Sequence, residues 1–339
     1  IYQQDIRVME NTIRNIVEKY FSPSEIESIG IFKQRVIITL QNVAEDKEKS
    51  AQLAEEVKKL EGIDKVSVVF TALKKNQPLN EAPAKWNVKG VKKIIAVASG
   101  KGGVGKSTTA VNLAMALSAQ GQKVALFDAD IYGPSIPTML GYEGATPISY
   151  DGKTFETFEF QGIRSMSIGS LIDRNTPLIW RGSKACGAIE QLLTEANWGE
   201  IDIMVIDMPP GTGDIQITLS QRLDFAGAVI VSTPQDIALI DAVKGVNMFK
   251  RVDVPILGII ENMSYYICPH CGSRDDIFGH AGAQETAKEL GVPFLGEIPL
   301  HIEIRTHADA GKPIVIAEPE SPYAKAYMDV AAKIIAELA

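Results

Sequence analysis

The residues from Gly100 to Ser107 have the pattern of a phosphate-binding loop. They read Gly-Lys-Gly-Gly-Val-Gly-Lys-Ser, between an apolar run and a helix-like pattern. Glycines let the backbone curl so that successive N–H groups face phosphate oxygens, and the following helix presents its positive end to the same anion. We therefore expect a nucleotide site whose contacts come from Gly100, Lys101, Gly102, Gly103, Val104, Gly105, Lys106, Ser107 and Thr108.

Two residues of this pattern and one later aspartate predict magnesium-dependent phosphate chemistry. Lys106 is placed to reach the outer phosphates, and the Ser107 hydroxyl is placed to bind Mg²⁺. The apolar run that leads into Asp207 fits the Walker B pattern, whose carboxylate holds Mg²⁺ through water. The Pro-Pro-Gly-Thr-Gly segment at 209–213 then suits a switch that senses the γ-phosphate.

Two more carboxylates, Asp128 and Asp130, follow the apolar run Val124–Phe127. In a parallel sheet the carboxyl ends of the strands meet at one edge, so both aspartates should face the same crevice as the phosphate loop. We expect Asp128, which lies nearer the strand, to support the loop or the water shell of the metal.

A Cys-Pro-His-Cys motif spans Cys268 to Cys271, and three interpretations compete for it. A redox pair would belong at the start of a helix in a thioredoxin fold, which this pattern does not predict. A closed metal site needs four ligands, and Cys186 is far away in sequence, so a homodimer with two thiolates from each chain would complete it. Thiolates alone suit zinc or an iron–sulfur cluster equally.

The remaining cysteine and histidines are given no catalytic role. We expect Cys186 to be a buried structural thiol and His270 to be a solvated loop residue. His280, His301 and His307 have no recognisable partner pattern.

The elements that position these residues alternate from Lys92 onward between strand-like and helical patterns. This alternation predicts an α/β fold over 92–339, with a mainly parallel, doubly wound sheet. The predicted strands are Ile94–Ala98, Val124–Phe127, Met204–Ile206, Ala228–Val231, Ile256–Ile260 and Phe294–Gly296. The predicted helices are 106–119, 183–196, 236–250, 282–290 and 323–338.

Residues 1–73 predict a separate small α+β domain. An amphipathic helix over Ile6 to Tyr20 ends before Pro23, paired strands follow at Ile29–Phe32 and Arg35–Leu40, and a second helix precedes a strand at Val66–Phe70. Residues 74–91 carry two prolines and no sustained period, as is typical of a linker. Trp86 in that linker should pack on one of the domains it joins.

Composition limits the functional class. The 339 residues are 45 % hydrophobic and 22 % charged, with a formal net charge of −8. The acidic balance argues against a nucleic-acid surface, and no apolar run approaches a membrane span of about 20 residues. With three cysteines and no signal-peptide pattern, we expect a reducing, cytoplasmic location, or the mitochondrial matrix if the chain is a processed eukaryotic homologue.

The loop with its early lysine resembles the deviant phosphate loop of the MinD/ParA/ArsA class of P-loop ATPases. That resemblance implies a dimer in which Lys101 crosses into the nucleotide site of the partner. It also implies that Asp130 orients the attacking water and that Asn262 pairs with the base. An amide can donate to N7 and accept from the N6 amine of adenine, which favours ATP.

Five motifs together resemble the Mrp/Nbp35 family, to which ApbC and Ind1 belong, and the N-terminal block resembles its MIP18-like domain. The family resemblance implies a slow ATPase that holds a [4Fe–4S] cluster between two subunits at Cys268 and Cys271, receives it from a cluster-assembly scaffold and delivers it to apo-proteins. It also implies an interface near Trp180 and Arg181. The motifs are Ser99–Ser107, Asp128–Ser135, Asp207–Asp214, Glu261–Ser264 and Cys268–Cys271.

Two alternatives stay open at this point. One is a partition or positioning ATPase of the ParA/MinD type that binds DNA or a membrane. The acidic balance and the mixed-sign charge of the helix over 323–338, which favours packing on the sheet, count against it. The other is a zinc-bridged dimer with the same ATPase core.

Overall fold

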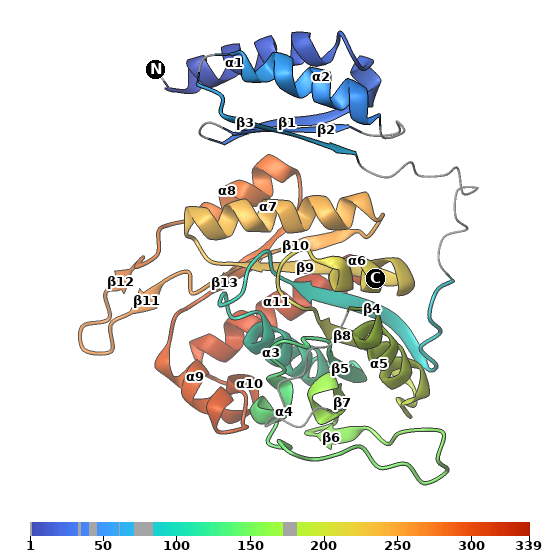
Figure 1. Cartoon of the computed structure of the whole chain (residues 1–339). Helices are drawn as coiled ribbons and strands as arrows, with labels where there is room; N and C mark the ends of the chain where they lie inside the picture. The colour runs from blue at the N-terminus through green and yellow to red at the C-terminus, as the bar shows by residue number, and fades with distance from the viewer. Residues whose placement is uncertain (1, 33–34, 41–45, 61, 71–83, 172–181) are drawn as a thin grey trace. The chain divides into compact units, whose positions relative to one another are not determined.

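The computed structural model describes residues 2–32, 35–40, 46–60, 62–70, 84–171 and 182–339. The chain separates into two compact units, Ile1–Glu81 and Ala82–Ala339 (Figure 1). The predicted interface segment at Trp180 and Arg181 lies outside the described residues, as do residues 74–83 of the predicted linker. In the described ranges, no helix combines the length and the apolar character that a membrane crossing requires.

The first unit is a three-stranded sheet with two helices, in the order α1 (Tyr2–Val17), β1 (Ile26–Phe32), β2 (Arg35–Leu40), α2 (Lys47–Lys58) and β3 (Lys65–Phe70). β1 and β2 pair, as predicted, and they run antiparallel, while β3 joins β2 in parallel. The core is apolar, with Ile13, Val17, Ile38, Leu53 and Val57 fully buried. Helix α1 ends at Val17 rather than near Tyr20, because Lys19 and Tyr20 donate to the carbonyls three residues before them and tighten the chain into a turn.

The second unit is built on an eight-stranded sheet in the order β13-β10-β9-β4-β8-β5-β7-β6. All neighbouring strands run parallel except β6, which pairs antiparallel with β7. The predicted mainly parallel α/β fold is confirmed. The strands are β4 (Val91–Ala98), β5 (Val124–Asp128), β6 (Phe158–Phe160), β7 (Ile163–Ser167), β8 (Ile201–Asp207), β9 (Phe225–Ser232), β10 (Ile256–Asn262) and β13 (Phe294–Ile298).

The central strand β4 has apolar side chains on both faces, which is why its sequence is a continuous apolar run rather than an alternation. Ile95 and Val97 belong to one buried cluster, which includes residues of α3 and α11. Ile94, Ala96 and Ala98 belong to the other, which includes residues of α5, α6, α7 and α8. Successive residues of a strand point to opposite faces, so β4 is covered by helices on both sides (Figure 1).

Nine α-helices and one 3₁₀ turn are described in this unit. They are α3 (Lys106–Ala119), α4 (Ile136–Met139), α5 (Gly182–Glu195), α6 (Asp214–Arg222), α7 (Asp236–Arg251), α8 (Gly282–Leu290), α9 (Ile302–Asp309), α10 (Ile314–Ala317) and α11 (Pro322–Leu338), with a 3₁₀ turn η2 at Ile168–Leu171. The predicted packing of the last helix is confirmed, because Tyr327, Val330 and Ile334 of α11 are buried. α11 therefore uses its apolar face inside the protein.

Strand β4 begins at Val91, inside the segment interpreted as a linker, and Trp86 packs on the second unit as predicted. The Trp86 N–H donates to the Arg222 carbonyl at 2.7 Å, and the Arg222 guanidinium lies 5.4 Å from the centroid of the Trp86 ring. Both contacts fix the entry of the chain into the second unit at the end of α6.

Candidate functional site

The glycine-rich loop connects β4 to α3, and two of its glycines have no room for a side chain. Gly105 is the N-cap of α3 with φ +79°, and a Cβ there would lie 2.2 Å from Nδ2 of Asn262. A Cβ on Gly100 would lie 2.0 Å from the carbonyl oxygen of Asp241 in α7. The loop therefore curls tightly at the N-terminus of α3, where backbone N–H groups and the helix end favour an anion.

Lys106 is a buried cation held between two carboxylates. Its Nζ lies 2.5 Å from Oδ1 of Asp207 and 3.6 Å from Oδ2 of Asp130, and it is 3.2 Å from the Ser107 hydroxyl. The side chains of Lys106 and Asp207 are 6 % and 0 % exposed. Strand β8 supplies Asp207 and the end of β5 leads to Asp130, so residues distant in sequence meet at one edge of the sheet.

One carboxylate oxygen of Asp207 is available to bind a metal ion. Burial raises the pKa of Asp207, while the charge of Lys106 and hydrogen bonds from Lys106 and Ser107 oppose the rise. Its Oδ2 atom is buried and has no hydrogen-bond partner in the described chain. A carboxylate oxygen beside a serine hydroxyl matches the oxygen donors that Mg²⁺ uses, so the residues fit a magnesium site.

Asp128 holds the loop that follows β5. Its Oδ1 accepts from the Asp130 N–H at 3.0 Å, and its Oδ2 accepts from the N–H groups of Ser135 and Ile136 and from the hydroxyl of Ser167 at 3.0 to 3.2 Å. Asp128 thus organises the loop that carries Asp130. Burial, and then the nearby charge of Asp207, raise the pKa of Asp128 to about 7.

The raised pKa of Asp128 makes a prediction about stability and pH. Because the folded protein binds this proton more tightly than the unfolded chain, the stabilisation is greatest below the unfolded pKa and is lost as pH rises toward 7. Replacing Asp128 with Asn should remove the part of this pH dependence that Asp128 contributes, a slope of at most about 1.4 kcal/mol per pH unit. Denaturant unfolding of both proteins from pH 5 to pH 8 tests it, and parallel pH profiles would contradict it.

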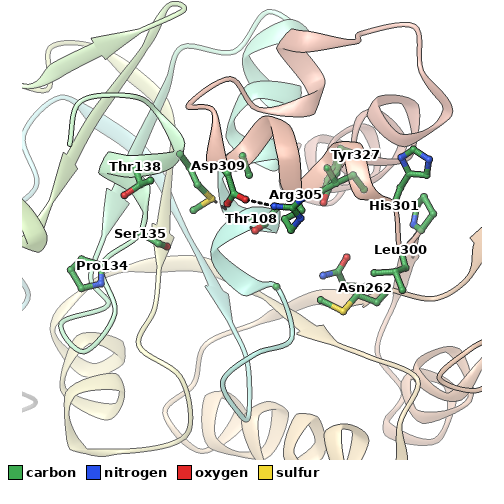
Figure 2. A pocket seen from close by; sticks show the side chains of 16 residues that line it. Thr108, Pro134, Ser135, Thr138, Asn262, Leu300, His301, Arg305, Asp309 and Tyr327 are labelled. Atoms are coloured by element: carbon green, nitrogen blue, oxygen red, sulfur yellow. Dashed lines mark hydrogen bonds and ion pairs between the residues drawn. The ribbon is translucent and has the colours of Figure 1, made fainter.

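A pocket of about 510 Å³ opens beside the loop, between the end of β10 and helix α9 (Figure 2). Its wall includes Gly105, Thr108, Asn262 and Leu300. Arg305 and Asp309 lie one turn apart on α9 and form an ion pair at 2.7 Å, and the His301 ring stacks on Tyr323 with centroids 3.9 Å apart. Asn262 Nδ2 donates to the Val104 carbonyl at 2.8 Å, which joins the pocket wall to the loop.

Cys268 and Cys271 lie in the turn of a separate two-stranded ribbon, formed by β11 (Tyr266–Ile267) and β12 (Arg274–Asp275). The ribbon projects from the sheet (Figure 1). The Cys268 N–H donates to the Ser273 carbonyl at 2.9 Å, and the Gly272 N–H donates to the Cys268 carbonyl at 2.8 Å. Both cysteines are free thiols; Cys268 is half-buried and Cys271 is exposed.

The surroundings of the Cys271 thiol stabilise its thiolate form relative to that of an ordinary cysteine. Hydrogen bonds from the Ser273 side chain, the Ser273 backbone and Cys268 lower the pKa of Cys271. The Cys271 sulfur and the Ser273 hydroxyl are 3.1 Å apart. Thiolates are the ligands of zinc and of iron–sulfur clusters, so this turn fits two ligands of such a site.

The other predicted residues lie in different surroundings. Lys101 is half-buried and forms no ion pair with any carboxylate that the structure describes. His270 is exposed, as predicted. Cys186 is half-buried in α5 rather than fully buried, and burial raises its pKa, as suits an inert thiol.

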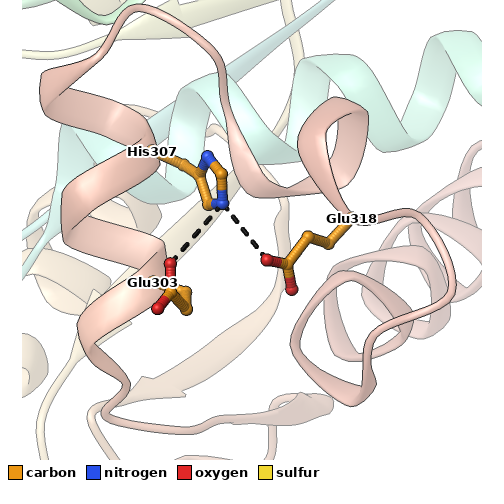
Figure 3. A group of neighbouring side chains, drawn as sticks. All are labelled: Glu303, His307 and Glu318. Carbon is orange, nitrogen blue, oxygen red and sulfur yellow. Dashed lines mark hydrogen bonds and ion pairs between the residues drawn. The ribbon is translucent and has the colours of Figure 1, made fainter.

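Sequence reasoning missed a cluster around His307. Figure 3 shows Glu303 and Glu318 pointing at this ring, and His307 Nε2 lies 3.2 Å from Glu318 Oε1 and 3.6 Å from Glu303 Oε2. Glu303 and His307 are four residues apart on α9, but Glu318 comes from the end of α10, so no local pattern predicts the group. We interpret it as an ion-pair link between the two helices.

Comparison with known proteins agrees with this geometry. A family model described as ParA, NUBPL iron-transfer P-loop NTPase, matches residues 90–335. An iron-sulfur cluster carrier protein from Haemophilus influenzae is 54 % identical over 259 residues, which are 76 % of this chain and 69 % of that protein. An iron-sulfur cluster transfer protein NUBPL from Dictyostelium discoideum is 50 % identical over 252 residues, which are 74 % and 78 % of the two chains.

A solved structure is also similar. The nucleotide-binding protein from Archaeoglobus fulgidus, in complex with ADP, superimposes with a TM-score of 0.61 and 38 % sequence identity. The match covers 70 % of this chain and 92 % of that one.

Proposed function

The chain belongs to the family of NUBPL iron-transfer P-loop NTPases, and on that premise we propose that it is an ATP-hydrolysing carrier of iron–sulfur clusters. It would hold a [4Fe–4S] cluster between two copies of itself, receive it from an assembly scaffold and transfer it to apo-proteins. The observation that carries the proposal is one unit that joins a phosphate-binding constellation to two free thiols on a projecting turn.

The nucleotide is proposed to lie along the loop, with its phosphates against the N–H groups of residues 100–108. Lys106 would exchange part of its contact with Asp207 and Asp130 for phosphate oxygens, because all three groups compete for one buried ammonium. The base would enter the pocket beside Asn262. Ser107 and Asp207 would hold Mg²⁺, which neutralises phosphate charge when it is bound.

Hydrolysis is assigned to Asp130 and to two lysines. Asp130 accepts hydrogen bonds from the N–H groups of Tyr132 and Gly133, so its position depends on the loop that Asp128 holds. There it would orient the attacking water. Lys106 in the same chain, and Lys101 from a second copy, would stabilise the charge that develops on the transferred phosphoryl group. A slow ATPase is expected, because Lys101 contributes only when two copies meet.

The proposed dimer is based on the number of thiolate ligands that a cluster needs. A [4Fe–4S] cluster takes four thiolates, and the turn offers Cys268 and Cys271. Two copies related by a two-fold axis supply the other pair. An exposed turn leaves such a cluster accessible to an acceptor, as a carrier requires.

The proposed function is tested by metal and sulfide analysis of the full chain purified and reconstituted without oxygen. We expect about two iron and two sulfide ions per chain, in a species with the mass of a dimer. Zinc at about half an ion per chain, without sulfide, would instead support the zinc-bridged dimer. A monomer that binds neither metal would contradict both.

The positioning ATPase is the weaker proposal for this chain. Helix α11 buries its apolar face inside the unit, so it offers no apolar face to a membrane. We propose neither a nucleic-acid nor a membrane partner.

A further inference from the structure

Glu261 is a fully buried acid at the carboxyl end of β10. Its two oxygens accept two short hydrogen bonds, from the Ser264 hydroxyl and from the Ala283 N–H, each at 2.6 Å. A buried carboxylate is costly unless it is hydrogen-bonded or paired. The structure describes no cation beside it; the positive end of helix α8, whose first turn contains Ala283, offsets the charge.

These two partners are the ends of the segment that carries the cysteines. Ser264 lies just before β11, and Ala283 lies in the first turn of α8, the first helix after β12. One carboxylate therefore closes a loop of about 20 residues whose turn holds Cys268 and Cys271. Glu261 therefore holds both ends of the segment whose turn carries the cysteines.

The next residue of β10 contacts the nucleotide site. Successive side chains of a strand point to opposite sides. While Glu261 binds the base of the cysteine ribbon, Asn262 donates to the Val104 carbonyl in the phosphate-binding loop and lines the pocket. The last two residues of β10 thus join the pocket to the ribbon without any intervening element.

The end of strand β13 also contacts both the cysteine ribbon and the pocket. The Ser264 N–H donates to Ile298 at the end of β13, and the Leu300 N–H donates to Tyr265 at the start of the ribbon. Leu300 also lines the pocket. Arg274 of β12 lies 4.1 Å from the centroid of the Tyr265 ring. The pocket and the ribbon therefore share one wall.

We propose that Glu261 is a positioning residue through which nucleotide in the pocket sets the position, and so the accessibility, of Cys268 and Cys271. This inference deepens the proposed function and rests on its nucleotide site. A ligand that moves Asn262 shifts the end of β10, and Glu261 passes the shift to both ends of the cysteine segment at once.

The test is the rate of thiol alkylation in the reduced, metal-free full chain, resolved for Cys268 and Cys271 by peptide mass spectrometry. In the native protein, saturating Mg-ADP or a non-hydrolysable ATP analogue should change the rate at either cysteine about fivefold, near the low end of couplings between two sites. In Glu261→Gln the nucleotide effect should fall below about twofold, while affinity for a fluorescent ATP analogue stays within about threefold.

Two further variants keep the result interpretable. Ser264→Ala removes one of the two hydrogen bonds to Glu261, so nucleotide should change the alkylation rate by an intermediate amount. This variant also provides a test if Glu261→Gln folds poorly. Glu285→Gln removes an exposed acid from the first turn of α8 and should behave as the native protein.

The proposal would be overturned if nucleotide changed the alkylation rate of a folded Glu261→Gln protein as much as that of the native protein. It would also be overturned if nucleotide did not change the alkylation rate of either cysteine in the native protein. Because no iron is present, neither result depends on whether the chain carries a cluster.

Discussion

A chain with serine in place of both Cys268 and Cys271 should lose cluster binding almost completely. The two residues are the free thiols of the projecting turn, and serine keeps their size while removing the soft thiolate that iron–sulfur clusters take as a ligand. We expect reconstituted iron and sulfide to fall at least about tenfold, because even changes around a metal's ligands cost 10- to 100-fold in affinity. Iron and sulfide analysis with the visible absorption spectrum measures this.

The matched control is Cys186→Ser. Cys186 is the remaining thiol of the chain and lies half-buried in α5, away from the turn. It should retain the native iron and sulfide content. A double variant of Cys268 and Cys271 that still binds a four-iron cluster would show that the cargo site is elsewhere.

Replacing Lys106 with Gln should lower the rate of ATP hydrolysis by about 100- to 1,000-fold, as removal of a preorganised charge-stabilising group does elsewhere. Lys106 is the buried cation nearest to both Asp130 and Asp207, and glutamine keeps much of its length without its charge. Phosphate release at saturating Mg-ATP measures the effect. The same change leaves Asp207 buried without its ion-pair partner, so the variant should also be less stable, by about 3–5 kcal/mol.

Two variants separate catalysis from stability. Lys123→Gln removes a lysine that is 64 % exposed and pairs only weakly with Glu200, so it should affect neither quantity. Combining Lys106→Gln with Asp207→Asn removes both charges of the closer ion pair and should recover much of the lost stability but none of the activity. A Lys106→Gln protein that hydrolyses ATP at the native rate would exclude the assigned role.

The central part of the fold could be predicted from sequence because its signals are local. A continuous apolar run, four glycines and two lysines define β4, the loop and the start of α3, and the structure places α3 at Lys106–Ala119 as expected. The meeting of Lys106 with Asp130 and Asp207 also followed from sequence, since parallel strands place their carboxyl ends along one edge.

The two edge strands β6 and β7, which follow β5 in the sheet order, could not be predicted in the same way. β7 reads Ile-Arg-Ser-Met-Ser, too short and too polar to signal a buried strand, yet Ser165 and Ser167 are fully buried. Their burial is explained by tertiary partners: Ser165 contacts the Tyr142 hydroxyl at 2.8 Å, and Ser167 donates to Asp128. Polar residues that are satisfied only by distant chain segments leave no local pattern.

The same reason explains why the role of Glu261 was missed. In the sequence it is one residue before Asn262, and the resemblance to known ATPases assigns a function only to the asparagine. Its partner Ala283 is 22 positions away and contributes a backbone N–H, which no side-chain motif encodes. A lone acid at the end of an apolar strand was the available signal, because such a residue needs a partner when buried.

The strand order has a consequence for how the protein is made. β4 lies at the middle of the sheet, yet Val91 pairs with Ile201 and Ile94 pairs with Phe225, so both neighbours of β4 are synthesised roughly 110 residues or more after it. At about 5–20 residues per second, the apolar run of β4 leaves the ribosome roughly 5–20 s before the strands that cover its edges. The three strands of the first unit lie within its first 70 residues and face no such delay. The central strand of the second unit therefore waits longer for its neighbours than any strand of the first unit does.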